Sequence, residues 1–135
     1  MQRILLAEDN KINQVVAAGV LKKLGYEVDI VEDGAAAVAA CAGEAYGAIL
    51  MDVMMPGVDG YQATGMIREV ERRLGNKPIP IIGLSARAMT GDRDIAIDAG
   101  MSDYLTKPLR TADLEVALRR WMPEPAEAQG AASPT

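Results

Sequence analysis

GAILMD, residues 47–52, is the stretch of this 135-residue sequence that decides the fold. It is a nearly continuous apolar run of strand length that ends at an acid, as expected of a central parallel strand covered on both faces. A segment with helical spacing follows this run and each of four others, so we predict five strand–helix units. The other four predicted strands are RILLA (3–7), YEVDIV (26–31), IPIIGL (79–84) and MSDYL (101–105).

Several helical segments carry start signals and apolar faces. Asp33 offers an N-cap for an Ala-rich second helix, and Thr111 offers one for the last helix. In that last helix Leu114, Leu118 and Trp121 fall on one face. The first helix has spacings of three and four between its apolar positions, which are Ile12, Val15, Val16, Val20, Leu21 and Leu24.

Repeated strand–helix alternation predicts the fold class. Parallel strands joined by right-handed crossovers place helices on both faces of one open sheet, so we expect an α/β protein with a single doubly wound five-stranded parallel sheet, (βα)5. A closed eight-unit barrel needs far more chain. From Pro123 the sequence PEPAEAQGAASPT lacks an apolar pattern. We therefore expect a folded domain over 1–122 and a disordered tail or linker over 123–135.

Composition excludes several classes of function. Half of the residues are apolar, which supports one core, and the net charge of −5 argues against direct binding to nucleic acid. The lone Cys41 cannot form an internal disulfide, and the absence of His removes Cys/His zinc sites and His-based triads. No apolar run is long enough to cross a membrane, and the start MQRILLAEDN lacks the features of a signal peptide. These features predict a cytoplasmic protein without membrane contact.

Polar residues follow four of the five predicted strands. Glu8 and Asp9 follow the first strand, Asp52 ends the third, Ser85 follows the fourth and Lys107 follows the fifth. In open parallel sheets ligands bind outside the carboxyl ends of the strands, so these side chains should meet at one edge.

Three carboxylates at one edge repel one another unless a proton or a cation neutralises them. Oxygen ligands without His or Cys suit a hard cation, so we infer Mg²⁺ or Mn²⁺. Such a metal beside Lys107 and the Ser85 hydroxyl forms a clamp for a phosphoryl group. Asp52 ends the most buried strand and is our candidate nucleophile, which would form an aspartyl phosphate.

Each of these residues also has an ordinary structural explanation. Asp, Asn, Ser and Gly are common after strands because loops need caps and turns. Glu8 and Asp9 could simply favour the N-terminal dipole of the first helix, Ser85 could be a cap, and Lys107 could be a solvated surface amine. Only the combination supports a phosphoryl site.

Four motifs follow one another along nearly the whole predicted domain: LLAEDN at 5–10, MDVMMPGVDGYQA at 51–63, GLSARA at 83–88 and DYLTKP at 103–108. With them the sequence resembles the receiver domains of two-component response regulators. The NKINQ run after the acidic pair is most similar to receivers of hybrid sensor histidine kinases. The resemblance implies the flavodoxin-like strand order 2-1-3-4-5.

The resemblance also implies a role for each matching residue. Asp52 would be the phosphoacceptor, Asp9 a direct Mg²⁺ ligand and Glu8 an acid that acts through water. The backbone carbonyl of Met54 would complete the protein's share of the metal ligands. The side chains of Met54 and Arg87 would flank the route of the water that attacks the phosphoryl group, and so tune its lifetime.

Three further positions are implied to take part in transfer and switching. Lys107 would pair with the phosphoryl oxygens, and a cis peptide bond would fall at Lys107–Pro108. Ser85 would donate its hydroxyl to the phosphoryl group, and Tyr104 would be the switch aromatic. The helix expected at about 90–99 has the weakest apolar stripe. This fits either an element that shifts between states or an ordinary marginal surface helix.

The resemblance implies a signalling domain, not a turnover enzyme. A histidine kinase or histidine phosphotransfer protein would donate the phosphoryl group, and no GxxxxGK[ST] nucleotide loop is present. A downstream protein, or a second copy, would bind the face made by the fourth helix, fifth strand and fifth helix. One alternative is a pseudo-receiver that binds partners without phosphorylation. Another is a phosphatase with an Asp nucleophile, but such enzymes carry a second Asp where this sequence has Met54.

Overall fold

The computed structural model describes residues 2–43, 45–86 and 91–122. Within them, strands and helices alternate along the chain as predicted. The strands are β1 (Arg3–Ala7), β2 (Glu27–Val31), β3 (Ala48–Asp52), β4 (Ile81–Ser85) and β5 (Asp103–Thr106). The helices are α1 (Lys11–Lys23), α2 (Gly34–Gly43), α3 (Gly60–Leu74), α4 (Asp92–Ala99) and α5 (Thr111–Trp121).

The five strands form one parallel sheet in the order β2-β1-β3-β4-β5. This confirms the doubly wound, flavodoxin-like order. β3 lies in the middle, with Leu50 opposite Leu6 of β1 on one side and opposite Ile82 of β4 on the other. All five residues of β3 are buried, as its nearly continuous apolar run predicted.

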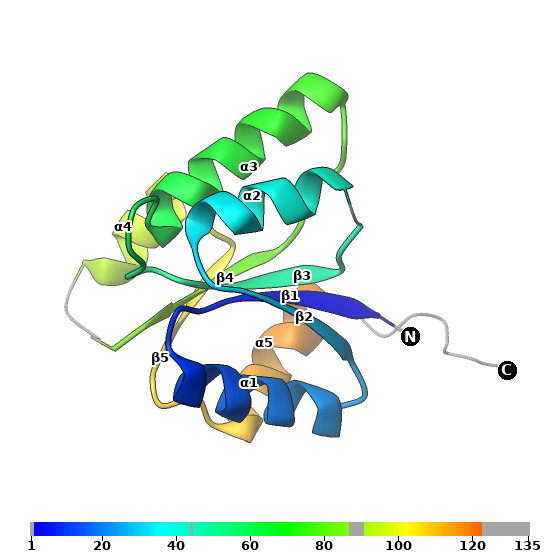
Figure 1. The fold of residues 1–135 in the computed structure, drawn as a ribbon, viewed down its shortest axis with the longest axis vertical. Helices are drawn as coiled ribbons and strands as arrows, with labels where there is room; N and C mark the ends of the chain where they lie inside the picture. The colour runs from blue at the N-terminus through cyan, green and yellow to red at the C-terminus, as the bar shows by residue number, and fades with distance from the viewer. Residues whose placement is uncertain (1, 44, 87–90, 123–135) are drawn as a thin grey trace, which may run out of the picture.

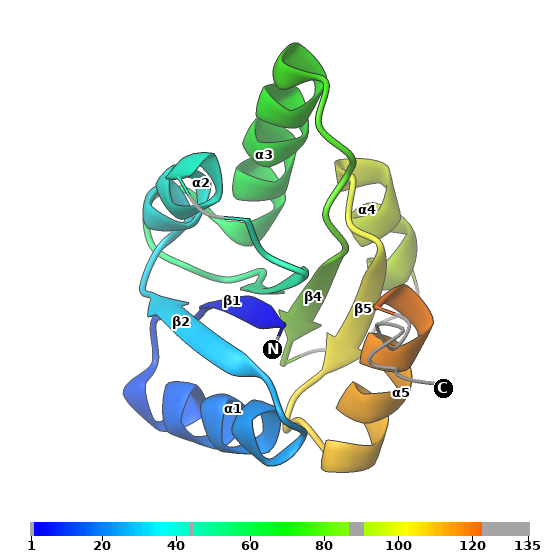
Figure 2. The ribbon, with the colours of Figure 1, turned by 90° about the vertical axis from the view of Figure 1, so that its right-hand side faces the viewer.

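Helices cover both faces of the sheet, with α2, α3 and α4 on one face and α1 and α5 on the other (Figures 1 and 2). Because side chains alternate along a strand, neighbouring residues of β1 enter different cores. Leu5 packs with residues of α2, α3 and α4, whereas Leu6 packs with residues of α1 and α5. Both cores consist of aliphatic side chains, methionine and a few tyrosines, since the sequence contains no Phe.

The buried face of α1 differs from the prediction. Three of its apolar residues point outward: Ile12 is 74% exposed, Val15 73% and Val16 47%. Of the six predicted apolar positions the helix buries only Leu21, together with Gln14, Ala17 and Ala18. The small alanines allow α1 to lie close to the strands, and a hydrogen bond offsets the burial of the Gln14 amide.

The helix ends agree with the sequence in some places and not in others. Asp33 caps α2 as predicted, since its Oδ1 accepts a hydrogen bond from Ala36 N at 2.7 Å. Thr111 was the wrong residue for the cap of α5, because the helix already includes it and the N-cap is Arg110, without a side-chain cap bond. On the apolar face of α5, Leu114 and Leu118 are fully buried, whereas Trp121 is 36% exposed. The expected tail, 123–135, lies outside the described residues.

Candidate functional site

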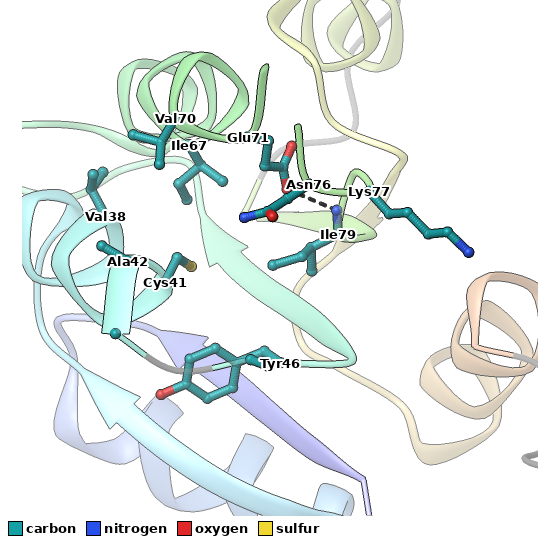
Figure 3. A pocket seen from close by; sticks show the side chains of 12 residues that line it. Val38, Cys41, Ala42, Tyr46, Ile67, Val70, Glu71, Asn76, Lys77 and Ile79 are labelled. Carbon is teal, nitrogen blue, oxygen red and sulfur yellow. Dashed lines mark hydrogen bonds between the residues drawn. The ribbon is translucent and has the colours of Figure 1, made fainter. Parts of the chain in front are cut away.

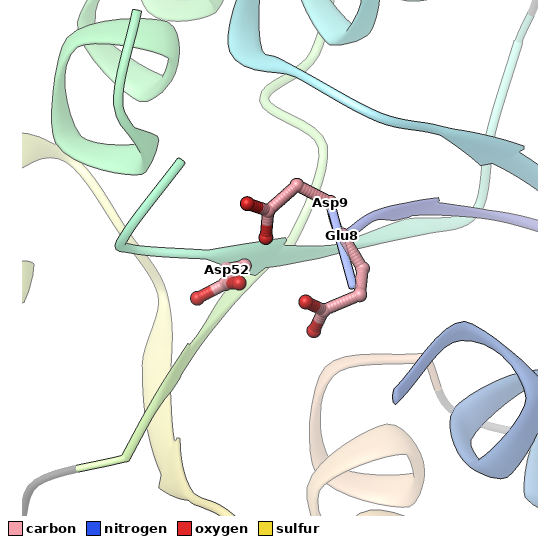
Figure 4. Close-up of side chains that lie close together, drawn as sticks. All are labelled: Glu8, Asp9 and Asp52. Carbon is pink, nitrogen blue, oxygen red and sulfur yellow. The ribbon is translucent and has the colours of Figure 1, made fainter. Parts of the chain in front are cut away.

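Three acids converge at the carboxyl edge of the sheet. Glu8 and Asp9 directly follow β1, and Asp52 ends β3, the neighbouring strand. One carboxylate oxygen from each lies within 4.8 Å of the others (Figure 4). Glu8 is 1% exposed and Asp52 is 4% exposed, while Asp9 is open to solvent. The sequence therefore placed these three residues correctly in one cluster.

The start of α1 holds Glu8 in position. Asn10 caps the helix, since its Oδ1 accepts a hydrogen bond from Asn13 N at 3.0 Å. The backbone N–H of Asn10 also donates to Glu8 Oε2 at 3.2 Å. The buried Gln14 amide donates to the Glu8 carbonyl oxygen at 2.8 Å. Gln14 is a positioning residue that the sequence did not single out, because only the structure shows that its side chain faces the sheet.

Lys107 joins two of the acids. Its Nζ lies 2.8 Å from Glu8 Oε1 and 3.1 Å from Asp52 Oδ2. The backbone of Lys107 is tied to the end of β4, because its N–H donates to Ser85 O at 2.6 Å. The peptide bond between Lys107 and Pro108 is cis, as the resemblance implied. Lys107 is therefore a partner of the buried carboxylates and not the solvated amine of the alternative interpretation.

The loop after β3 approaches Asp52 from the other side. The backbone N–H of Met54 donates to Asp52 Oδ1 at 3.2 Å, while the Met54 side chain is 75% exposed. Asp59 and Gln62 then form a reciprocal capping box at the start of α3. This cap returns the chain to the sheet, and Gly60 N–H donates to the Val53 carbonyl at 3.1 Å.

Burial and charge perturb the protonation of the cluster. Burial, with a hydrogen bond that the protonated Asp52 carboxyl donates to Glu8, raises the pKa of Asp52 to about 6, against the opposing effects of Met54 N–H and Lys107. Burial also acts to raise the pKa of Glu8, but its hydrogen bond with Lys107 and other contacts outweigh it, so that pKa is lowered. The two carboxylates raise the pKa of Lys107 in spite of burial, and its ammonium form persists. Negative charge thus remains at the sheet edge near neutral pH.

The predicted switch residues lie beside the acidic cluster and on the adjoining strand. Ser85 is buried at the end of β4, one residue beyond Leu84, which lies opposite Asp52. Tyr104 on β5 is half-buried and packs against the core that α4 covers. The predicted Arg87 lies outside the described residues.

The donor set fits a hard divalent cation. Three carboxylates supply oxygen atoms, and neither nitrogen nor sulfur ligands lie among the described members of the cluster. Such oxygen donors, completed by water, suit Mg²⁺ or Mn²⁺. Lys107 can neutralise charge on an anion held next to the metal. The arrangement can therefore hold a divalent cation and a phosphoryl group side by side.

The acidic cluster and the lysine lie at the carboxyl edge of a doubly wound sheet, where open parallel α/β sheets bind their ligands. The family model of the response regulator receiver domain matches residues 4–119. The chain belongs to this family. Within the described residues, no helix has the length and apolar character needed to cross a membrane.

The proteins similar to this chain include a sensor protein and a receiver domain of a sensor histidine kinase. The sensor protein GacS of Pseudomonas syringae pv. syringae is 41% identical over 119 residues, which cover 88% of this chain and 13% of that protein. The chain thus spans about an eighth of this relative's length. The magnesium-bound receiver domain of sensor histidine kinase PA1611 of Pseudomonas aeruginosa PAO1 is 48% identical, with a TM-score of 0.78, over 89% of this chain and 96% of that chain.

A second solved structure is a complex. It contains the Saccharomyces cerevisiae histidine phosphotransfer protein Ypd1 and the receiver domain of the response regulator Ssk1. Its matching chain is 29% identical, with a TM-score of 0.84, and the match covers 89% of this chain and 88% of that one.

Proposed function

We propose that residues 1–122 form a phosphoacceptor domain that takes a phosphoryl group from phosphohistidine onto Asp52. The observation that carries this proposal is the convergence of Glu8, Asp9 and Asp52 with the Lys107 amine. An Asp52 oxygen attacks phosphorus, the new P–O bond forms, and the P–N bond to the donor histidine breaks. The family relationship and the receivers of sensor kinases among the relatives support the same reaction.

The residues of this chain divide the work of the transfer. Glu8, Asp9, Asp52 and the Met54 carbonyl would hold Mg²⁺, which when bound neutralises charge on the phosphoryl oxygens. The magnesium-bound receiver of PA1611 supports this assignment. Lys107 lies beside Asp52 Oδ2 and can pair with another phosphoryl oxygen.

Phosphorylation would then change the face made by α4, β5 and α5. A phosphoryl group on Asp52 offers acceptor oxygens to the Ser85 hydroxyl and draws the end of β4 inward. Tyr104, half-buried on the adjoining strand, would turn further inward. The described part of α4 buries only Asp92 and Ala96, which is consistent with an element of low local stability. A downstream protein or a second copy would bind the altered face.

The donor would dock over α1. Ile12, Val15 and Val16 form an exposed apolar patch on this helix, next to the acidic edge that α1 adjoins. A histidine phosphotransfer protein seated there can bring its phosphohistidine to Asp52. The complex of the Ssk1 receiver with Ypd1 supports a partner of this kind.

Intact-mass measurement after incubation with acetyl phosphate and Mg²⁺ tests the phosphoacceptor role. We expect a gain of one phosphoryl group, which is lost when EDTA removes the metal and in Asp52→Asn. Asp94→Asn, which changes an exposed acid on α4, is the matched control and should be phosphorylated normally. A domain that gains no phosphate but still binds partners would be the pseudo-receiver of the alternative interpretation.

Val15→Asp tests the donor surface. Placing a charge in the apolar patch should slow transfer from a phosphorylated phosphotransfer protein at least ten-fold, because a fraction of the docking free energy is lost. Reaction with acetyl phosphate needs no docking and should be unchanged. Equal transfer by Val15→Asp and wild type from the protein donor would contradict docking on α1.

A further inference from the structure

A cavity of about 490 Å³ opens between α2 and α3, at the amino edge of the sheet (Figure 3). It is lined at the C-terminal ends of both helices and by residues just before β3 and β4. The acidic cluster lies at the opposite, carboxyl edge. The cavity is therefore separate from the phosphoryl site. Its apolar walls are Val38, Cys41, Ile67, Val70, Ile79 and the ring of Tyr46.

The sequence of α2 explains why the cavity is open. The helix reads GAAAVAACAG, so Val38 and Cys41 carry its largest side chains. Alanine and glycine cannot fill the space that remains between α2 and the longer side chains of α3. At the lining positions nearest the end of the helix, Ala42 and Gly43 are small and exposed. The volume falls in the range of small-molecule sites, about 300–1,000 Å³.

One buried polar group faces this apolar space. Glu71 of α3 lines the cavity and is 6% exposed. Its Oε1 accepts a hydrogen bond from Arg68 at 2.9 Å, and its Oε2 accepts one from Ile79 N at 2.8 Å. A carboxylate offers about four acceptor positions, so it can accept another hydrogen bond from a ligand. Arg68 already neutralises its charge, which removes the need for a cationic ligand.

The charges around the cavity also disfavour an anion. The Glu71 carboxylate, already paired with Arg68, offers an anion only acceptor oxygens, and the Lys77 amine points away from the apolar walls toward solvent (Figure 3). We propose that this cavity binds a neutral small molecule that has an aromatic or branched apolar body and one N–H or O–H group, which donates to Glu71. The apolar body replaces water against the walls, and the single donor fixes the orientation.

Indole is a suitable probe because it combines an apolar bicyclic body with one N–H donor. We expect indole to cause saturable shifts in the amide NMR signals of Cys41, Val70 and Glu71, with a dissociation constant of about 1 mM or lower. 1-Methylindole has no donor and should bind about five-fold more weakly, the effect of one hydrogen bond. Shifts that do not saturate, or that map to other parts of the domain, would overturn the proposal, as would equal binding of the two probes.

A pair of variants locates the site. Ala42→Phe fills the mouth of the cavity and should abolish the indole shifts. Ala39→Phe changes another exposed alanine of α2, one that does not line the cavity, and should leave binding unchanged. Indole binding that survives Ala42→Phe would show that the ligand lies elsewhere.

Cys41 gives a second measurement on the unaltered protein. It is the only cysteine of the chain and lines the cavity. Burial, followed by the charge of Glu71, raises the pKa of the thiol to about 11, so alkylation is measured at alkaline pH. Saturating indole should slow alkylation at least three-fold, and 1-methylindole at the same concentration should protect less. An unchanged rate with indole would contradict binding in this cavity.

Discussion

Replacing Gly60 by alanine would place a methyl group against the strand that carries Asp52. Gly60 is the first residue of α3 and directly follows its N-cap. An added Cβ would lie 2.7 Å from Val53 Cα and closer still to the carbonyl oxygen of Asp52. These neighbours are backbone atoms of β3 and the residue after it, so no flexible side chain can move aside. The helix or the end of the strand must shift instead.

The magnitude follows from the atoms involved. Overpacking of this kind costs about 1–3 kcal/mol, and we expect the upper part of that range because backbone must move. Alanine recovers less than about 1 kcal/mol of helix propensity at such a position. With a urea dependence of about 2 kcal/mol per molar, the net loss lowers the unfolding midpoint by about 0.5–1.5 M.

Gly65→Ala is the matched control in the same helix. An added Cβ at Gly65 meets no heavy atom within 4 Å, and the residue is exposed. This variant should gain about 0.5–1 kcal/mol, because alanine loses less backbone entropy than glycine on folding. Urea unfolding followed by circular dichroism therefore gives opposite signs for the two variants. Equal stability of Gly60→Ala and wild type, or equal effects of the two alanines, would refute the close approach of α3 to β3.

Three further predictions concern protonation and positioning. Because the raised pKa of Asp52 is about 6, about half of the Asp52 carboxyl groups are protonated at pH 6. Binding of Mg²⁺ should therefore release up to about half a proton at pH 6, and the affinity for Mg²⁺ should rise with pH. Calorimetry in two buffers with different ionisation enthalpies measures the release, and identical heats would contradict it. Asp103 is buried, which acts to raise its pKa, but the Trp121 indole and other partners outweigh this and lower it. Its contribution to stability is present above its unfolded pKa and is lost as the pH falls below about 4. Asp103→Asn should therefore lower the free energy of unfolding by its full amount at neutral pH and by progressively less in acid. Urea unfolding at several pH values measures this loss, and the same loss at every pH would refute the reasoning. Gln14→Met removes the hydrogen-bond donor to the Glu8 carbonyl oxygen and should lower the free energy of unfolding by about 1–2 kcal/mol. It should also slow phosphorylation by acetyl phosphate, and an unchanged rate would show that Gln14 does not position the site.

The fold could be predicted from the sequence because buried parallel strands have a distinctive pattern. Residues 48–51 of the run that ends at Asp52 are all apolar, and the structure buries them together with Asp52. The orientation of α1 could not be predicted in this way, because that helix has apolar residues on two faces. The face with Ala17 allows close packing, and the hydrogen bond of Gln14 makes its burial possible. The spacing of apolar residues indicates which positions can be buried, but it does not indicate a hydrogen bond that allows a polar side chain such as Gln14 to be buried.

The site was predictable in its members but not in its pairings. The rule that ligands collect at the carboxyl edge of a parallel sheet brought Glu8, Asp9 and Asp52 together correctly. The pairing of Lys107 with Glu8 as well as with Asp52 could not be predicted, because that contact depends on how the chain turns after β5. The capping error at Thr111 has a similar origin, since a polar residue near a helix start can lie on either side of the boundary.

Locating the phosphoryl group on the chain tests the central claim most directly. The domain is phosphorylated by a phosphohistidine donor in the presence of Mg²⁺, treated with borohydride, which reduces an acyl phosphate to an alcohol, and then sequenced by mass spectrometry. We predict that homoserine appears at residue 52 and that Asp52→Asn carries no reduced residue. Reduction at Glu8 or Asp9, or a phosphoryl group that survives in Asp52→Asn, would contradict the assignment of Asp52 as the phosphoacceptor.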